Sequence, residues 1–226
     1  MVALFVILTF VIAVLVDHLL SRQPINVVSD ATEPLPVPRP RLIPSIVAGF
    51  SLPENLSYHP GHTWAVAETP ELVRVGADDF AVKLAGAMTS IDTPTRGQWI
   101  RQGQKIVSMH HQGREIALVS PIEGTVVDVN QTAIDNPSLA QSDPYGEGWL
   151  IKVNAPDQKT NFRNLLTGNV ARKWLDEAAA RLRFVMMPNA SLATVMAQDG
   201  GVAVTNVIDQ LTDADWDKVQ KEFFLA

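Results

Sequence analysis

The feature that most limits what this chain can fold into is a series of short, β-branched runs between about residues 51 and 153, separated by Gly, Pro, Asn and Asp. Runs of this length, with turn residues between them, are typical of a small all-β barrel or sandwich. One short helix is expected within the series, from Asp78 to Leu84. The sequence therefore predicts a mainly β domain at residues 51–160, with strands at 63–67, 72–75, 87–91, 105–110, 115–120, 124–129 and 149–153.

Residues 161–226 predict a helical C-terminal extension. Apolar residues recur at spacings near 3.6 from Leu165 to Leu182, with Thr167 and Asn169 near the start of the helix. A second helix is expected from Asp213 to Phe224, where Thr212 and Asp215 resemble a capping box. Trp216, Val219 and Phe223 share one face of that helix, which predicts packing against the barrel or another chain. Between the helices, residues 200–204 suggest a turn and a short strand.

The N-terminus predicts a transmembrane helix at residues 1–21. Residues 2–16 are almost unbroken Val, Leu, Ile, Phe and Ala, and Leu19 and Leu20 extend the run. About twenty helical residues span roughly 30 Å, the thickness of the hydrocarbon layer. A cleaved signal peptide is less favoured, because no basic residue precedes the run and no small-x-small site follows it. A buried helix of the soluble domain is the third alternative.

The charges around this segment predict its orientation. No Lys or Arg precedes it, whereas Arg22, Arg39 and Arg41 follow. The positive-inside bias therefore predicts a single-pass protein of the inner (cytoplasmic) membrane, attached through residues 2–20, with its soluble domain in the cytoplasm. Residues 22–50 are rich in proline and predict an extended linker, although a docking site for a proline-recognising module is an alternative.

Composition excludes several classes of function. A net charge of -6 gives no electrostatic footprint for nucleic acid, and the absence of cysteine excludes disulfides, thiolate ligands and cysteine nucleophiles. His110 and His111 are adjacent on an expected strand, so they point to opposite faces and do not predict a metal site. Asp78 and Asp79 open the short helix, where capping accounts for them. Because no nucleophile elbow or phosphate loop appears either, we expect no catalytic residue and no enzyme activity.

Stretches of the β domain resemble the glycine cleavage system H proteins. They are Tyr58–Trp64, Val75–Ala81, Ser120–Val126 and Asp143–Lys152. The resemblance implies a lipoyl-type, barrel-sandwich hybrid fold, with His62 as a structural residue. It also implies a hairpin whose tip carries a lysine, to which lipoic acid is joined as an amide that shuttles an aminomethyl group between enzymes.

This chain lacks that lysine. Counting back from Ser120-Pro121, the lysine position falls on Gly113, and a slip of one residue would place Arg114 there. Glycine has no amine, and a guanidinium stays protonated and is a poor nucleophile. The nearest lysine, Lys105, is on the incoming strand. Gln112-Gly113 instead predicts a tight structural turn, because glycine adopts positive φ without cost, so no lipoyl cofactor is expected.

The preferred hypothesis is a non-catalytic, membrane-anchored interaction or scaffold subunit of a larger complex, bound to other protein subunits. The alternative is a regulator or degenerate carrier linked to glycine cleavage or lipoate metabolism. A third is a solute-binding role for a pocket in the barrel.

Overall fold

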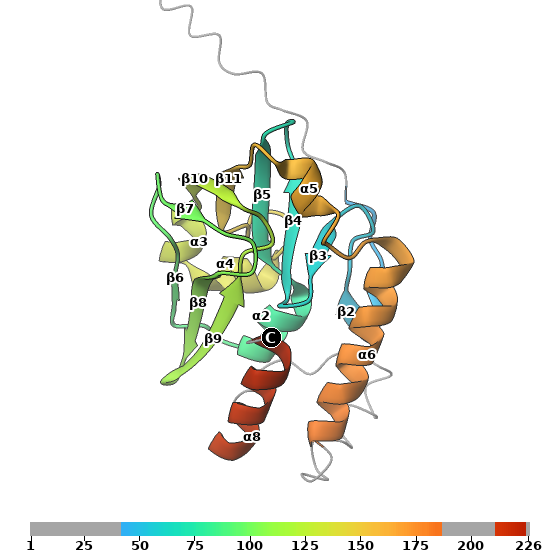
Figure 1. Ribbon diagram of the computed structural model, residues 1–226. Coiled ribbons are helices and arrows are strands. Elements are labelled where there is room, and N and C mark those ends of the chain that lie inside the picture. The colour runs from blue at the N-terminus through green and yellow to red at the C-terminus, as the bar shows by residue number, and fades with distance from the viewer. Residues whose placement is uncertain (1–41, 187–210, 225–226) are drawn as a thin grey trace, which may run out of the picture. The chain divides into compact units, whose positions relative to one another are not determined.

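The computed structural model describes residues 42–186 and 211–224 (Figure 1). The predicted transmembrane helix, the linker up to residue 41, and the turn and strand predicted at residues 200–204 lie outside these ranges. Within the two ranges, no helix combines the length and the apolar character that crossing a membrane requires.

The described chain is built mainly from antiparallel strands. A six-stranded sheet has the order β3-β4-β5-β11-β10-β7, a three-stranded sheet has the order β6-β8-β9, and β1 pairs with β2. The strands are β1 (Ile46–Val47), β2 (Phe50–Ser51), β3 (Ser57–His59), β4 (Thr63–Ala67), β5 (Leu72–Ala77), β6 (Ser90–Asp92), β7 (Trp99–Ile100), β8 (Lys105–His111), β9 (Arg114–Val119), β10 (Gly124–Val129) and β11 (Ile151–Asn154). The prediction of a mainly β fold followed by C-terminal helices is confirmed.

The bounds of the predicted strands agree with the structure at some positions and differ at others. The strands predicted at 63–67 and 124–129 coincide with β4 and β10. The strand predicted from residue 87 begins only at Ser90, and the one predicted from residue 149 begins at Ile151. Before β6, the carbonyl of Ala87 accepts a hydrogen bond from the ring of His111 rather than from a neighbouring strand.

The folded unit begins earlier than the sequence indicated. Residues 46–51 fall at the boundary of the predicted linker, but β1 and β2 pair there as a small hairpin. Phe50 is only 3% exposed, and its ring lies 5.0 Å from that of Phe80. The end of this proline-rich stretch is therefore part of the core.

Trp64 lies at the centre of the core. It is fully buried, and its indole Nε1 donates to the carbonyls of Ala77, at 2.9 Å, and Pro144, at 3.1 Å. Across the β4–β5 pair it faces Gly76, where a Cβ atom would lie 2.6 Å from the indole ring. Glycine is thus required at position 76 because the tryptophan ring rests on the backbone of the neighbouring strand.

Helix α2 (Asp79–Ala85) begins as the sequence predicts. Asp78 is its N-cap, and one carboxylate oxygen accepts from the backbone N–H of Ala81 at 2.8 Å. Tyr145 stabilises the same end of the helix, since its hydroxyl accepts from the N–H of Asp79 and donates to the carbonyl of Ser51. Three further short helices follow, two between β10 and β11 and one after β11. They are α3 (Gln131–Asp135), α4 (Pro137–Ser142) and α5 (Gln158–Phe162).

The C-terminal helices pack onto the β domain. Helix α6 (Gly168–Met186) buries Ala171, Leu175, Ala178, Ala179 and Leu182. The helix begins near Thr167 and Asn169, as predicted, whereas Leu165 and Leu166 of the apolar pattern precede it, and Leu166 forms a backbone bridge with Tyr58 of β3. Helix α8 (Asp213–Val219) continues directly into η2 (Gln220–Phe224), a π-helical turn. Figure 1 shows α8 beside α6 and the β9 strand.

Candidate functional site: the β8–β9 hairpin

The β8–β9 hairpin ends in a two-residue turn. His111 and Arg114 are the last paired residues, which leaves Gln112 and Gly113 as the connection. Both have positive φ, 46° and 84° respectively. Positive φ at both central residues is the pattern of a type I′ turn, whose twist matches that of antiparallel strands. The structure confirms the tight turn that the sequence predicts.

Gly113, the position to which the resemblance assigns the carrier lysine, lies in this turn with no side chain. A Cβ atom built there would have no heavy atom within 4 Å, so the position faces open space. The chain's lysines are Lys83, Lys105, Lys152, Lys159, Lys173, Lys218 and Lys221. Lys105 is the first residue of β8, at the end of the strand opposite the turn and roughly 20 Å along it at the usual rise per residue.

Arg114, the neighbour of Gly113, binds the C-terminal segment. Its Nη2 donates to the carbonyl of Leu211 and to the carboxylate of Asp213, each at 2.8 Å. Gln220 of η2 adds a hydrogen bond from its side chain to the carbonyl of Glu115, at 3.2 Å. The first residues after the turn are therefore held by a segment about a hundred positions further along the chain.

The two adjacent histidines of β8 point to opposite faces, as predicted. His111 is buried and donates to the carbonyl of Ala87, whereas the Nε2 of His110 lies 2.9 Å from a carboxylate oxygen of Asp92. On the outer face, Glu115 accepts from Lys105 and Ser108, and these hydrogen bonds lower the pKa of its carboxyl group. Among residues 42–186 and 211–224, no three His, Asp or Glu side chains gather in a way that would hold a metal ion.

His62 and Asp78 form a buried pair beneath the hairpin. Their side chains are 1% and 2% exposed, and Nδ1 of His62 lies 2.8 Å from Oδ2 of Asp78. The imidazole stacks on Phe80 with ring centroids 4.1 Å apart, and the Trp174 ring lies 4.8 Å away. Because aromatic rings cover the pair, it positions β4 against α2 rather than offering a base to a substrate.

Burial also shifts the pKa values of the residues around this pair. Desolvation and the nearby carboxylate of Asp78 raise the pKa of the Tyr58 and Tyr145 hydroxyls above the usual range, so both act as neutral hydrogen-bond donors. Desolvation, with a smaller effect of neighbouring His62, lowers the pKa of His59. Its unprotonated Nδ1 accepts from the N–H of Gly61 at 3.0 Å.

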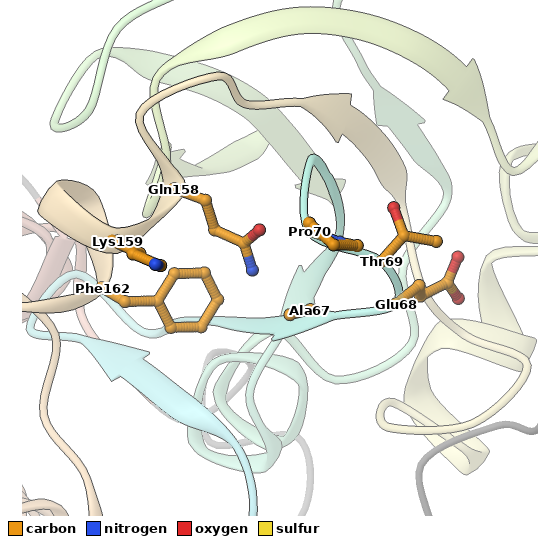
Figure 2. Close-up of a pocket in the computed structure, with 7 residues that line it drawn as sticks. All are labelled: Ala67, Glu68, Thr69, Pro70, Gln158, Lys159 and Phe162. Atoms are coloured by element: carbon orange, nitrogen blue, oxygen red, sulfur yellow. The ribbon is translucent and has the colours of Figure 1, made fainter.

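A separate surface hollow of about 460 Å³ lies between the β4–β5 turn and α5 (Figure 2). It is lined by Ala67, Glu68, Thr69, Pro70, Gln158, Lys159 and Phe162. The carboxylate of Glu68 is already paired with Arg74, at 3.1 Å, and with Lys152, at 3.0 Å. The open hollow therefore presents an apolar floor without a convergent set of reactive groups.

The contacts of Arg114 are the part of the site that sequence reasoning missed. The capping signal at Thr212 locates the start of α8, and the structure confirms it, since Thr212 Oγ1 accepts from the N–H of Asp215. Nothing in the local sequence, however, relates Leu211 or Asp213 to a hairpin so distant along the chain. Only the tertiary fold brings them together.

Comparison with known proteins agrees with the resemblance. The sequence pattern of the family described as glycine cleavage H-protein matches residues 56–178. The glycine cleavage system H protein of Thermobifida fusca is 37% identical over 113 residues, which cover 50% of this chain and 89% of that protein. That of Gloeobacter violaceus is 34% identical over 121 residues, covering 54% of this chain and 93% of that protein.

Among solved structures, a glycine cleavage system H protein from Mycobacterium marinum is similar, with 30% identity, a TM-score of 0.47, and coverage of 52% of this chain and 93% of that one. The family match takes in the hairpin, α2 and the strands around Trp64, and it extends over more than half of the 226 residues. The chain belongs to the glycine cleavage H-protein family.

Proposed function

We propose that this protein is a member of the H-protein family that carries no lipoyl group and acts as a non-catalytic interaction subunit of a larger membrane complex. In this proposal residues 2–20 anchor it in the inner membrane, and the following proline-rich segment holds the barrel at the cytoplasmic face. The barrel and the C-terminal helices then dock other protein subunits.

One observation carries the proposal. The hairpin ends in Gln112-Gly113, two residues without an amine, closed by the His111–Arg114 pair. Forming an amide with lipoic acid requires a primary amine at the tip, and a glycine in a two-residue turn offers none. The guanidinium of Arg114 is bound to the C-terminal segment and remains charged, so it does not replace that amine.

The experiment that tests this proposal is intact mass spectrometry of the full-length chain, purified in detergent from membranes of cells that make lipoate. We expect the mass of the unmodified polypeptide. An added lipoyl mass on any lysine would restore the carrier function and overturn the proposal. A lipoylated H protein from the same cells is the positive control for cofactor supply.

A second experiment tests the interaction role. Cross-linking in native membranes, followed by detergent extraction and size separation, should recover the chain joined to other subunits. Recovery as a free monomer only would contradict this role. Because the chain has no cysteine, a single Ser29→Cys variant also tests the orientation. A thiol reagent that cannot cross the membrane should label this variant in opened vesicles and not in intact cells.

The retained H-protein frame supports the second candidate, a regulator or degenerate carrier. Trp64, Gly76 and Tyr145 keep the barrel packed, and residues 56–178 match the family, so in this candidate function a protein that recognises H proteins would also bind this barrel. Direct binding to a glycine decarboxylase or a lipoate ligase, measured with the unmodified chain, would favour this candidate over the membrane-complex role. A lack of binding would leave the interaction subunit as the better explanation.

A further inference from the structure

Residues 211–224, termed the C-terminal cover below, lie against the hairpin at the place where its second strand begins. Arg114 donates to Leu211 and Asp213, and Gln220 donates to the carbonyl of Glu115. The π-helical turn η2 packs directly against β9. A protein that gripped this hairpin near its turn would have to contact the same residues of β9.

The apolar half of the cover fills a surface of the barrel. Val219, Phe223 and Phe224 are at most 2% exposed. The ring of Phe223 lies 5.3 Å from that of Phe80, and the ring of Phe224 lies 5.5 Å from that of His62. Without the cover, an aromatic surface next to the hairpin would face solvent.

The polar half of the cover is held more weakly. The Asp213 side chain is 98% exposed, and that of Arg114 is 22% exposed. Ion pairs in such a setting contribute little and are screened by salt. The cover also lies outside residues 56–178, the part matched by the family. The Arg114–Asp213 ion pair therefore adds little to the attachment of the cover, and the barrel beneath the cover lies within the residues matched by the family.

We infer that the C-terminal cover is a built-in competitor that withholds the β8–β9 hairpin and the adjacent aromatic surface from protein partners, and that it detaches while the barrel stays folded. This inference rests on the proposed function, because it names the surface through which such a subunit would dock. A partner that replaces the cover has to make the same contacts as the cover. It therefore needs a helical segment with an acidic side chain at its start and adjacent aromatic residues at its end.

Thiol reactivity tests the detachment, since the chain has no cysteine of its own. Val219→Cys places a small thiol under the cover, and Val126→Cys places one in the barrel; both positions are fully buried. In the full-length chain, we expect the thiol at position 219 to react with a soluble disulfide reagent at a rate well above that of the thiol at 126. Equal rates would mean that the cover opens only when the whole domain unfolds, and would overturn the inference.

A charge reversal identifies the contact that holds the cover. Asp213→Arg removes one hydrogen-bond partner of Arg114, whereas Asp217→Arg makes the same charge change at an exposed position of the same helix. Combined with Val219→Cys, the first change should raise the reaction rate by about three- to tenfold, the effect of losing a surface ion pair and adding a repulsion. The second change should leave the rate within about twofold of the parent. The same increase in both variants would contradict the role assigned to Arg114.

Whether the cover keeps protein partners away from the hairpin is tested by placing a lysine, which a lipoate ligase can modify, in the turn. The Gly113→Lys variant alone should be a poor substrate for a purified lipoate ligase. Adding Asp213→Arg should raise the initial rate of lipoylation by about three- to tenfold, the same increase as for the thiol reaction. Adding Asp217→Arg should not raise that rate. If Asp213→Arg brings no increase, the cover does not withhold the hairpin. This result is distinguishable from a failure of the proposed function, which would appear as a lipoyl group on the unaltered chain or as recovery of that chain as a free monomer only.

Discussion

At the scale of single residues, Asp78 joins two parts of the fold through its two carboxylate oxygens. Oδ1 caps α2 by accepting from the N–H of Ala81, and Oδ2 pairs with His62 at the start of β4. Both contacts are 2.8 Å long and buried. Losing this carboxylate would leave the N–H of Ala81 and the imidazole of His62 without this hydrogen-bond partner. Such a loss lowers the free energy of unfolding, because a buried polar group without a partner is costly. Asp78 is thus a structural residue, as the capping interpretation of the sequence predicts.

The turn itself gives the first prediction. Gly113→Ala should lower the free energy of unfolding by about 1 kcal/mol, because a Cβ atom is strained at a φ of 84° even though the space around it is open. Gln112→Asn should raise it, since Asn tolerates positive φ better than Gln and Asn-Gly is the preferred pair for this turn. Urea denaturation of the two variants measures both effects. A stabilising Gly113→Ala would contradict the type I′ assignment.

His59 gives a prediction on pH. Its pKa in the folded chain lies below the ordinary value of 6.5, so the unfolded chain takes up the proton first as the pH falls. The contribution of His59 is therefore complete above about pH 6.5 and is lost as the pH falls through the folded-state pKa. The denaturation midpoint should drop between about pH 7 and about pH 5.

His59→Asn is the matched variant for this effect. The Oδ1 of Asn can accept from the N–H of Gly61 in place of Nδ1, and Asn does not titrate. The denaturation midpoint of the His59→Asn variant should fall less than that of the parent over the same pH range. The His62–Asp78 pair is present in both proteins, so it does not cause the difference. An identical drop in the two proteins would show that His59 does not contribute.

At the scale of elements, the N-terminus of α8 gives the third prediction. Thr212→Ala removes the side-chain oxygen that accepts from the N–H of Asp215, at 3.2 Å, and should destabilise the helix by about 1 kcal/mol. Thr212→Ser keeps the oxygen and is the control. Hydrogen exchange should show faster exchange in α8 of the alanine variant and unchanged exchange in β10. Equal acceleration in both elements would mean that α8 does not open by itself.

The elements also show what local sequence can predict. Strands β4 and β10 were predicted at their observed bounds because turn residues border both runs. Strands β1, β2 and β7 have two residues each, too few to show any period, and they exist because neighbouring strands complete their hydrogen bonds. The short helices α3 and α5 were missed for the same reason, since a single turn gives no repeat.

In the candidate site, too, the features set by neighbouring residues could be predicted, whereas those set by distant residues could not. The turn at Gln112-Gly113 was predicted because glycine in that position has a local steric meaning. The attachment of Arg114 to Leu211 and Asp213 was not predicted, because it depends on the packing of η2 against aromatic residues of the barrel. Long-range packing of this kind leaves no periodic trace in the sequence.

At the scale of the whole molecule, the fourth prediction concerns the membrane. Alkaline carbonate treatment of membranes should leave the full-length chain in the pellet, because a spanning apolar helix is not released when ionic contacts are lost. A variant lacking residues 2–20 should appear in the supernatant, and thermal unfolding should show that its barrel remains folded. Release of the full-length chain would contradict the proposed anchor.

Because η2 is a π-helical turn, the number of residues in it decides which way its last aromatic side chain points. Two consecutive aromatic side chains, Phe223 and Phe224, are both buried at the end of η2. Removing one residue from positions 220–222 would return the spacing to that of an α-helix and rotate the final ring by about 100° around the axis. A homologue with the same sequence except for one residue fewer in this turn would thus direct a different face of its last helical turn toward the barrel. Percentage identity does not reveal that difference.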